Sequence, residues 1–398
     1  MNESQAPASP LRVLHVLNGA DLYGANRCLL RFLMTVDRSR FLPVVVLPED
    51  GPLKKLIEAQ DIEIIVIPRL SIITRPVFCS WRIFPFFLNY TFSVLSLHRL
   101  IKQKDIHLVH TNTGVIVSSA LAAKLAGVPH VWHIREWFQE FHSIWPIYSW
   151  FITKSSSKVV AVSNAVAEQF NSRNHVVVVH DGFSREEFQV PKENLRTEFQ
   201  ARYGLAGHFV VGCVGRIKLV RKGQEFLVQA TALLKQRGLS IKTLIIGAPF
   251  RGNEEHLERM RRMVFELGIE DRVVFTGELK DARGAYAAMD VFALTSAQPE
   301  PFGGVVMEAM AMGLPVIATN IGGSLDQVEN DVTGVFVPPG DAAALADAIE
   351  KLMSNSELRQ RMGEAGVKRI HSHFSLAEAT NKIEKLFEEV VANGPSKF

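Results

Sequence analysis

The sequence lacks the marks of several common protein classes. Its three cysteines, Cys28, Cys79 and Cys213, lie far apart among apolar neighbours, which predicts reduced packing residues rather than disulfides or metal ligands. The N-terminal segment has no basic start followed by an apolar stretch, so it does not resemble a signal peptide. No apolar run reaches about 18 residues, the length of a membrane span. The formal net charge of +3 over 398 residues gives no support for nucleic-acid binding. We therefore expect a cytoplasmic protein with no nucleic-acid partner.

Short apolar runs alternate with helix-length amphipathic segments along the whole chain. Unbroken β-branched runs suit strands that are covered on both faces, as in a parallel sheet. The runs span residues 12–17, 44–47, 62–67, 106–110, 130–132, 159–162 and 176–179 in the first half, and 209–214, 243–246, 272–275, 291–294, 316–318 and 335–337 in the second. This order predicts an α/β fold with two doubly wound parallel sheets and right-handed crossovers.

A polar stretch near residue 190 separates the two halves. We therefore predict an N-terminal domain over residues 1–190 and a second domain over 191–375. Helical segments are expected at 342–353, 356–371 and 376–391, with residues 376–398 packing back toward the first domain. Ligands of doubly wound sheets bind beyond the carboxyl ends of the strands, so two facing domains would form a binding cleft.

Two carboxylates, Glu300 and Glu308, lie around a glycine-marked turn from strand to helix. The helix expected over residues 303–312 is otherwise apolar. An ionised carboxylate in such a helix is costly unless something pairs with it. The partner of Glu308 is either a structural cation such as Arg216 or the hydroxyl groups of a bound ligand.

Cations and glycines follow two strands of the second half. Gly215 and Arg216 end one strand, and Arg221, Lys222 and Gly223 open the next helix, a combination that favours an anion. The alternative is an ordinary exposed loop. Further along, Gly322-Gly323 allows either a tight turn or close approach of the backbone to a ligand.

Together these segments resemble the retaining glycosyltransferases of family four (glycosyl transferases group 1), whose GT-B fold has two Rossmann-like domains facing across a cleft. The resemblance is strong in the second half and looser in the first. The matching segments are Gly215-Arg216, Lys222-Gly223, Glu300-Pro-Phe-Gly303, Glu308-Ala-Met-Ala-Met-Gly313, Pro315-Val-Ile-Ala and Gly322-Gly323.

The resemblance implies that the second domain binds a nucleotide-diphosphate sugar and the first binds the acceptor. In this reading Glu308 holds the ribose, Glu300 contacts hydroxyls of the donor sugar, and Arg216 and Lys222 neutralise the leaving diphosphate. The loop from Arg216 to Lys222 is one residue longer than is common in the family, so Arg221 is the alternative phosphate ligand. Backbone amides of Phe302, Gly303, Gly304 and Val305, at a helix start, would hold sugar and phosphate oxygens.

The resemblance also implies a retaining hexosyltransferase. The sequence contains no Asp-x-Asp segment and no His/carboxylate metal cluster, so we expect a metal-independent reaction with no cofactor beyond the donor substrate. No carboxylate nucleophile can be assigned. Same-face transfer assisted by the leaving phosphate is therefore favoured.

Two segments of the first half resemble family elements with changes. Asp21-Leu-Tyr-Gly24-Ala-Asn26-Arg27 resembles the family's Gly-Gly-x-Glu-Arg loop, which implies a donor contact at Gly24 and an acceptor contact at Asn26. A plain turn from strand to helix is the alternative. Trp132-His133-Ile-Arg135-Glu136 ends a strand, which implies that His133 contacts the donor sugar, and we expect Arg135 to bind the acceptor. A structural histidine is the alternative there.

Two further segments support coarser predictions. His180-Asp181-Gly182-Phe183-Ser184, continuing to Phe188, resembles the family's hinge segment and predicts packing between the domains. Residues 75–104 are rich in aromatic and basic side chains, which suit either a core-packed helix or a surface that contacts a membrane or a lipid-linked acceptor. The aromatic residues are Phe78, Trp81, Phe84, Phe86, Phe87, Tyr90 and Phe92.

The expected function is transfer of a sugar from a nucleotide-diphosphate sugar to a glycan or glycolipid acceptor in surface-polysaccharide or cell-envelope biosynthesis. A sugar-nucleotide epimerase or hydrolase of the same fold is an alternative, and it would act without an added acceptor. A catalytically silent sugar-nucleotide-binding module is another, and it would bind the donor without turnover. The expected location is cytoplasmic, with peripheral contact at the inner face of the membrane through residues 78–104 left open.

Overall fold

The computed structural model of the protein describes residues 9–73, 83–184 and 186–395. These residues form two compact units, one of Met1–Gly182 with Leu376–Phe398 and the other of Phe183–Ser375. The division lies before residue 190, because Phe183 and Phe188 pack into the core of the second unit. Cys28 and Cys213 are free thiols, as predicted, and Cys79 lies outside the described residues.

The first unit is built on a parallel sheet in the order β3-β2-β1-β4-β5-β6-β7. Its chain enters at the centre, in β1, and the strand order reverses between β1 and β4, which creates the switch point at which doubly wound folds bind ligands. The strands are β1 (Leu11–Val16), β2 (Phe41–Leu47), β3 (Glu63–Val66), β4 (Leu108–Thr111), β5 (His130–Ile134), β6 (Lys158–Ala161) and β7 (Val176–Val178).

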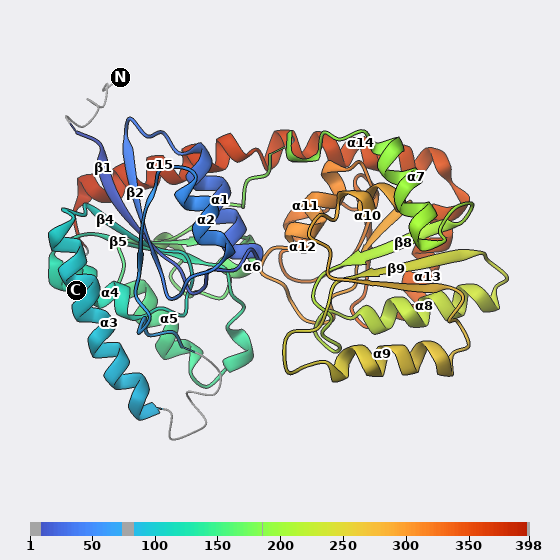
Figure 1. The fold of residues 1–398 in the computed structure, drawn as a ribbon, viewed down its shortest axis with the longest axis horizontal. Coiled ribbons are helices and arrows are strands. Elements are labelled where there is room, and N and C mark those ends of the chain that lie inside the picture. The colour runs from blue at the N-terminus through green and yellow to red at the C-terminus, as the bar shows by residue number, and fades with distance from the viewer. Residues whose placement is uncertain (1–8, 74–82, 185, 396–398) are drawn as a thin grey trace. The chain divides into compact units, whose positions relative to one another are not determined.

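Helices cover both faces of this sheet (Figure 1). One face packs against α1 (Gly24–Thr35), α2 (Pro52–Glu58) and the C-terminal helix α15 (Leu376–Asn393). The other packs against α3 (Ile83–Gln103) and α4 (Ser118–Ala126). The strands are therefore buried on both sides, which explains why the sequence has apolar runs without alternation there.

The C-terminal helix α15 is fixed to the first unit by apolar and ionic contacts. Phe387 is buried against the rings of His15, Phe32 and Phe41. Beside it, the buried Glu384 accepts hydrogen bonds from the Asp37 backbone N–H (2.8 Å) and from Arg40 (3.0 Å). A carboxylate loses its hydration on burial, and these two donors offset that cost.

The second unit has a parallel sheet in the order β10-β9-β8-β11-β12-β13. Its first strand is again central, so a second switch point lies between β8 and β11. The strands are β8 (Phe209–Val214), β9 (Ile241–Ile246), β10 (Val273–Gly277), β11 (Val291–Leu294), β12 (Val316–Thr319) and β13 (Gly334–Val337). Every apolar run predicted as a strand, in both halves, overlaps a strand in the structure.

Helices α8 (Gln224–Gln236), α9 (Glu255–Glu266) and α13 (Ala342–Ser354) cover one face of this sheet. Figure 1 shows α8 and α9 together on one side of β8 and β9. The other face packs against α7 (Lys192–Tyr203), α10 (Arg283–Ala288), α11 (Gly304–Ala311) and the end of α14 (Ser356–His373).

Helix α3 has two different faces. Val94, Leu97 and Ile101 are buried against the sheet, whereas Phe87 and Leu88 are 59% and 76% exposed. The helix therefore has a core-packed side and an exposed side, and contact of the exposed side with a membrane or a lipid-linked acceptor stays a prediction. Among the described residues, no helix combines the length and the apolar character needed to cross a membrane.

Candidate functional site

In the second unit, three loops meet at the carboxyl edge of the sheet, beyond β8, β11 and β12. Glu300, in the loop after β11, is buried, and its carboxylate lies 2.7 Å from the Nζ of Lys222, in the loop after β8. Ser296 donates a hydrogen bond to the same carboxylate oxygen. The predicted site residues Glu300 and Lys222 are therefore a direct ion pair.

The pKa of Glu300 is set by two opposing effects. Burial raises it, because the charged form loses hydration, but the positive charge and hydrogen bond of Lys222, with further contributions from Ser296 and Arg221, bring the pKa below its ordinary value. Glu300 is thus held ionised at neutral pH. A buried anion that can accept hydrogen bonds is suited to contact sugar hydroxyls.

The loop after β8 is held in shape by the first residues of α8. The side chain of Gln224 donates to the backbone oxygen of Arg216 (2.8 Å), and Glu225 accepts from the N–H of Val220 (2.5 Å). Gly223 has φ +65° and a Cβ there would lie 1.9 Å from the Thr295 carbonyl oxygen, so only glycine fits. Sequence reasoning did not identify Gln224 and Glu225 as supports of this loop.

The Gly322-Gly323 pair packs against the Glu300 loop itself. A Cβ on Gly322 or Gly323 would lie 2.5 Å or 2.2 Å from a backbone oxygen of Glu300 or Pro301, and the Gly323 N–H donates to the Glu300 carbonyl (2.7 Å). Gly322 and Gly323 lie in a turn, with Gly322 at φ +64°, so the turn reading from sequence is confirmed. They also allow the backbone to approach another loop closely.

Glu308 has a neutral partner that the sequence did not indicate. Its carboxylate accepts a 2.8 Å hydrogen bond from the hydroxyl of Tyr286, a buried residue of α10. Glu308 is half-buried on α11. The tyrosine hydroxyl offsets part of the cost of this carboxylate on an apolar helix.

 

Arg216 is exposed and lies beside a small hollow in the second unit. Its guanidinium stacks over the ring of Phe250 at 5.4 Å, and with Ile217, Lys218, Phe250 and Asn253 it lines a cavity of about 200 Å³. Lys222 contacts Glu300 instead, while the backbone oxygen of Arg221 accepts from the Ala297 N–H (2.9 Å). The three cations therefore lie on one loop in different surroundings.

In the first unit, Asn26 is buried at the start of α1. Its side-chain amide donates to Asp21 (2.9 Å), whereas its Oδ1 has no hydrogen-bond partner among the described residues. Gly24, the first residue of α1, has open space where a Cβ would lie. The loop thus presents backbone and one amide oxygen, and the part that Gly24 and Asn26 play in binding stays a prediction.

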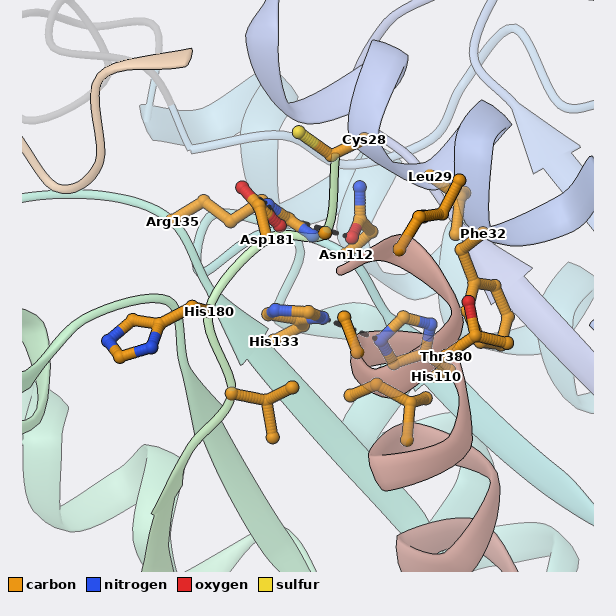
Figure 2. Close-up of a pocket in the computed structure, with 15 residues that line it drawn as sticks. Cys28, Leu29, Phe32, His110, Asn112, His133, Arg135, His180, Asp181 and Thr380 are labelled. Carbon is orange, nitrogen blue, oxygen red and sulfur yellow. Dashed lines mark hydrogen bonds and ion pairs between the residues drawn. The ribbon is translucent and has the colours of Figure 1, made fainter. Parts of the chain in front are cut away.

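Arg135 is paired with Asp181 and does not stand alone at the strand end. Its Nη1 lies 2.5 Å and 2.6 Å from the two carboxylate oxygens of Asp181, and its Nε donates to Asn112 (3.0 Å). Figure 2 shows these side chains together. Asp181, interpreted from sequence as part of a hinge, thus pairs with Arg135 inside the first unit, and Phe183 and Phe188 pack in the second.

His133 is buried at the end of β5, and its Nδ1 lies 3.3 Å from the Nε2 of His110 (Figure 2). His110 in turn contacts His15, with 2.9 Å between their Nδ1 atoms. Burial lowers the pKa of all three imidazoles, in His15 to about 3, so they are neutral at pH 7. His15 and His110 were missed from sequence, although isolated histidines within apolar strands were a visible signal.

A small cavity of about 30 Å³ adjoins this cluster and is lined by residues of α1, β4, β5 and α15 and of the loops that follow β4, β5 and β7. They include His110, Asn112, His133, Arg135 and Asp181. Such a volume has room for about one water molecule, which needs polar partners of this kind.

Family models match both halves of the chain. The model for glycosyl transferases group 1 matches residues 196–369, and the model for glycosyltransferase family 4 matches residues 23–187. The chain belongs to the group 1 glycosyltransferases of family four. The resemblance inferred from sequence is thereby confirmed.

Curated relatives of this group 1 glycosyltransferase share about a third of the aligned residues. The capsular polysaccharide biosynthesis glycosyltransferase CapM of Staphylococcus aureus is 30% identical over 62% of this chain and 62% of its own length. The D-inositol 3-phosphate glycosyltransferase of Corynebacterium glutamicum is 32% identical over 55% of this chain and 53% of its own length. The chain thus spans between half and two thirds of the length of these relatives.

Solved structures confirm the fold. Anabaena HepE in complex with UDP-glucose aligns with a TM-score of 0.80 and 24% identity, over 95% of this chain and 100% of that one. The WaaG glycosyltransferase involved in lipopolysaccharide biosynthesis aligns with a TM-score of 0.68 and 16% identity. The predicted GT-B architecture of two Rossmann-like domains is therefore correct.

The Glu300–Lys222 pair in this group 1 glycosyltransferase predicts that the parent protein and a Lys222→Met variant differ in stability by an amount that depends on pH. Because the folded protein lowers the pKa of Glu300, the pair stabilises the fold at neutral pH and loses this contribution as pH falls through that lowered pKa. In Lys222→Met, burial would raise the pKa of Glu300 above its ordinary value. We expect the variant to lose about 1–2 kcal/mol of unfolding free energy near pH 7, and the deficit to shrink as acid protonates Glu300.

Denaturant unfolding at a series of pH values measures this difference. Lys280→Met, which removes an exposed lysine from the same unit, is the matched control and should differ from the parent by a small amount at every pH. A Lys222→Met deficit that stays constant or grows on acidification would contradict the assignment.

Proposed function

We propose that this chain is a retaining glycosyltransferase that moves a hexose from a nucleotide-diphosphate sugar to a glycan or lipid-linked acceptor. The observation that carries the proposal is the buried Glu300–Lys222 pair at the carboxyl edge of the second sheet, with Arg216 and Arg221 on the same loop. Relatives named for capsular polysaccharide and phosphatidylinositol mannoside synthesis support a role in surface-polysaccharide or cell-envelope biosynthesis.

The proposed donor contacts follow the chemistry of the second unit. Glu308, oriented by Tyr286, would accept hydrogen bonds from the ribose, and Glu300 would accept them from the sugar hydroxyls. Helix α11 begins at Gly304, so the amides from Phe302 to Val305 lie at its positive end, where phosphate and sugar oxygens are favoured. Solved relatives in complex with UDP and UDP-glucose support a sugar nucleotide as donor.

The proposed reaction places negative charge on the departing diphosphate and positive charge on the sugar. Arg216 and either Lys222 or Arg221 would stabilise the diphosphate, a task that these fixed cations can perform without a metal ion. We infer that the acceptor attacks from the face that the diphosphate leaves, with the phosphate taking the acceptor proton. A product with the donor's anomeric configuration is expected, and isolation of a covalent glycosyl-enzyme would contradict this route.

In the first unit, we propose that His133 contacts the donor sugar and that Asn26 and Arg135 help to bind the acceptor. The orphaned Oδ1 of Asn26 can accept a hydrogen bond from an acceptor hydroxyl. Arg135 already binds Asp181 and Asn112, so it acts best by holding these polar groups in place. Gly24 leaves space for close approach of the donor to the start of α1.

The direct test is a transfer assay with donor and acceptor in the presence of EDTA. Arg216→Met should lower turnover about a hundredfold, because a preorganised cation facing the developing charge is removed. Arg262→Met, which removes an exposed arginine from α9, should retain the parental rate.

Other outcomes would support different functions. Donor conversion without an added acceptor would favour the epimerase or hydrolase, and donor binding without turnover on any acceptor would favour the silent module. Complete loss of activity on adding EDTA would contradict metal-independent transfer.

We also propose that the exposed face of α3 contacts an anionic membrane surface, which would place a lipid-linked acceptor near the enzyme. Phe87, Leu88, Phe92 and Leu95 are large exposed apolar residues on this helix. Arg69 lies over the ring of Phe92 at 5.4 Å and supplies a cation beside them. Apolar side chains interleaved with cations are typical of interfacial helices.

Flotation with anionic liposomes tests this surface. The parent protein should float, and Leu88→Glu should float much less, because Leu88 is 76% exposed and a carboxylate is repelled by anionic lipid. Phe265→Glu is the matched control, since Phe265 is 71% exposed on α9 of the second unit. Equal flotation of the two variants would contradict the assignment.

A further inference from the structure

Three buried histidines lie side by side on the central strands of the first unit. His15 on β1 is in register with His110 on β4, and β5 follows next in the sheet with His133. Their rings form a chain of two contacts, His15 Nδ1 to His110 Nδ1 at 2.9 Å and His110 Nε2 to His133 Nδ1 at 3.3 Å. We call these three residues the histidine relay.

The relay is buried and uncharged. The three residues are 1%, 2% and 5% exposed, and Phe387 of α15 packs against the rings of both His15 and His110. Burial lowers the pKa of each imidazole, so each ring carries a single N–H.

His110 gives the relay a direction. Both of its nitrogens are in contact with another histidine, yet a neutral ring has one donor and one acceptor. His110 must therefore accept from one neighbour and donate to the other. Consequently the tautomer of His15 determines the tautomer of His133, whose Nε2 has no hydrogen-bond partner among the described residues.

The charges at the two ends favour one direction. The positive charge of Arg38 acts on His15, whereas Arg135, near His133, is paired with the Asp181 carboxylate. A neutral imidazole is favoured when its N–H points away from a nearby cation. Arg38 has the less direct counter-charge of the two arginines, so the N–H of His15 should point away from Arg38. His15 would then donate to His110 Nδ1, His110 Nε2 would donate to His133 Nδ1, and the third proton would lie on His133 Nε2.

We propose that His15 and His110 are positioning residues that hold His133 in the Nε2–H tautomer, so that His133 donates a hydrogen bond to a ligand oxygen. That the ligand oxygen is a hydroxyl of the donor sugar rests on the proposed function. The relay itself does not. In this arrangement His133 acts as a fixed donor and not as a general base, because its Nδ1 lone pair is already occupied by His110.

The tautomer of His133 can be measured in the full-length protein. Nitrogen-15 NMR of histidine-labelled protein distinguishes a protonated ring nitrogen from a bare one, and the spectrum of His133→Gln identifies the signals of His133. We expect Nε2 to be protonated and Nδ1 to be bare. A bare Nε2 in the parent protein would overturn the proposal, whether or not the protein transfers sugar.

Two substitutions at His15 test the coupling. His15→Asn keeps an N–H donor toward His110 and should preserve both the His133 tautomer and the transfer rate. His15→Asp, at a pH at which the new carboxyl group is ionised, offers only an acceptor. This should reverse the relay, leave His133 Nε2 bare and lower turnover about tenfold, the effect of one lost hydrogen bond. Loss of activity with an unchanged tautomer in His15→Asp, or a reversed tautomer with parental activity, would overturn the proposal.

Thermal unfolding shows whether His15→Asp folds. If it does not, His15→Leu takes its place: His110 then lacks its donor, and His133 should show a mixture of tautomers, whereas a single unchanged Nε2–H form would overturn the coupling. If the parent transfers no sugar to any acceptor, the proposed function fails, while the NMR result still decides the relay.

Discussion

The buried ion pair between Glu300 and Lys222 is the interaction on which the rest of the second unit's site depends. A carboxylate at this depth remains ionised only if a cation is held against it, so the loops after β8 and β11 must stay in contact. Gly223 permits that contact on one side, and Gly322 and Gly323 bring a third loop against the Glu300 backbone on the other. The glycines, the cations and the acid therefore depend on one another, because each of the three loops is held in shape by contact with its neighbours.

The first unit also buries polar groups that need partners, but these groups are neutral. Its central strands carry histidines in place of apolar residues, and α15 covers them with Phe387. His110 contacts an imidazole through each of its nitrogens, and at one end of this chain His133 Nε2 has no hydrogen-bond partner among the described residues. The C-terminal segment thus contributes to the surroundings of a residue far from it in sequence.

The sequence was sufficient for features that depend on local pattern. The apolar runs became strands, and the spacing of Glu300 and Glu308 identified the family, because strand burial and the loop-to-helix turn are encoded by neighbouring residues. The partners of these acids could not be predicted. Tyr286, which binds Glu308, and Asp181, which binds Arg135, come from distant segments, and only the packing of whole elements brings them together.

The same limit explains the other differences. The turn predicted as one reading of Gly322-Gly323 is present, but a sequence does not show that another loop packs against it. Helix α3 was read as either core or surface, whereas a helix against one face of a sheet has both kinds of side. In both cases the residue types were interpreted correctly, and the missing information was three-dimensional.

The central claim is that the second unit binds a nucleotide-diphosphate sugar through these loops and α11. Thermal unfolding with uridine, guanosine and adenosine diphosphate sugars tests it most directly, with Glu308→Gln as the variant and Glu266→Gln, at an exposed position on α9, as the control. One donor should raise the unfolding temperature of the parent and the control, because it stabilises them by about 2.7 kcal/mol at a hundredfold excess over its Kd. The same donor should raise the unfolding temperature of Glu308→Gln much less. No shift with any donor, or an equal shift in Glu308→Gln, would contradict the account.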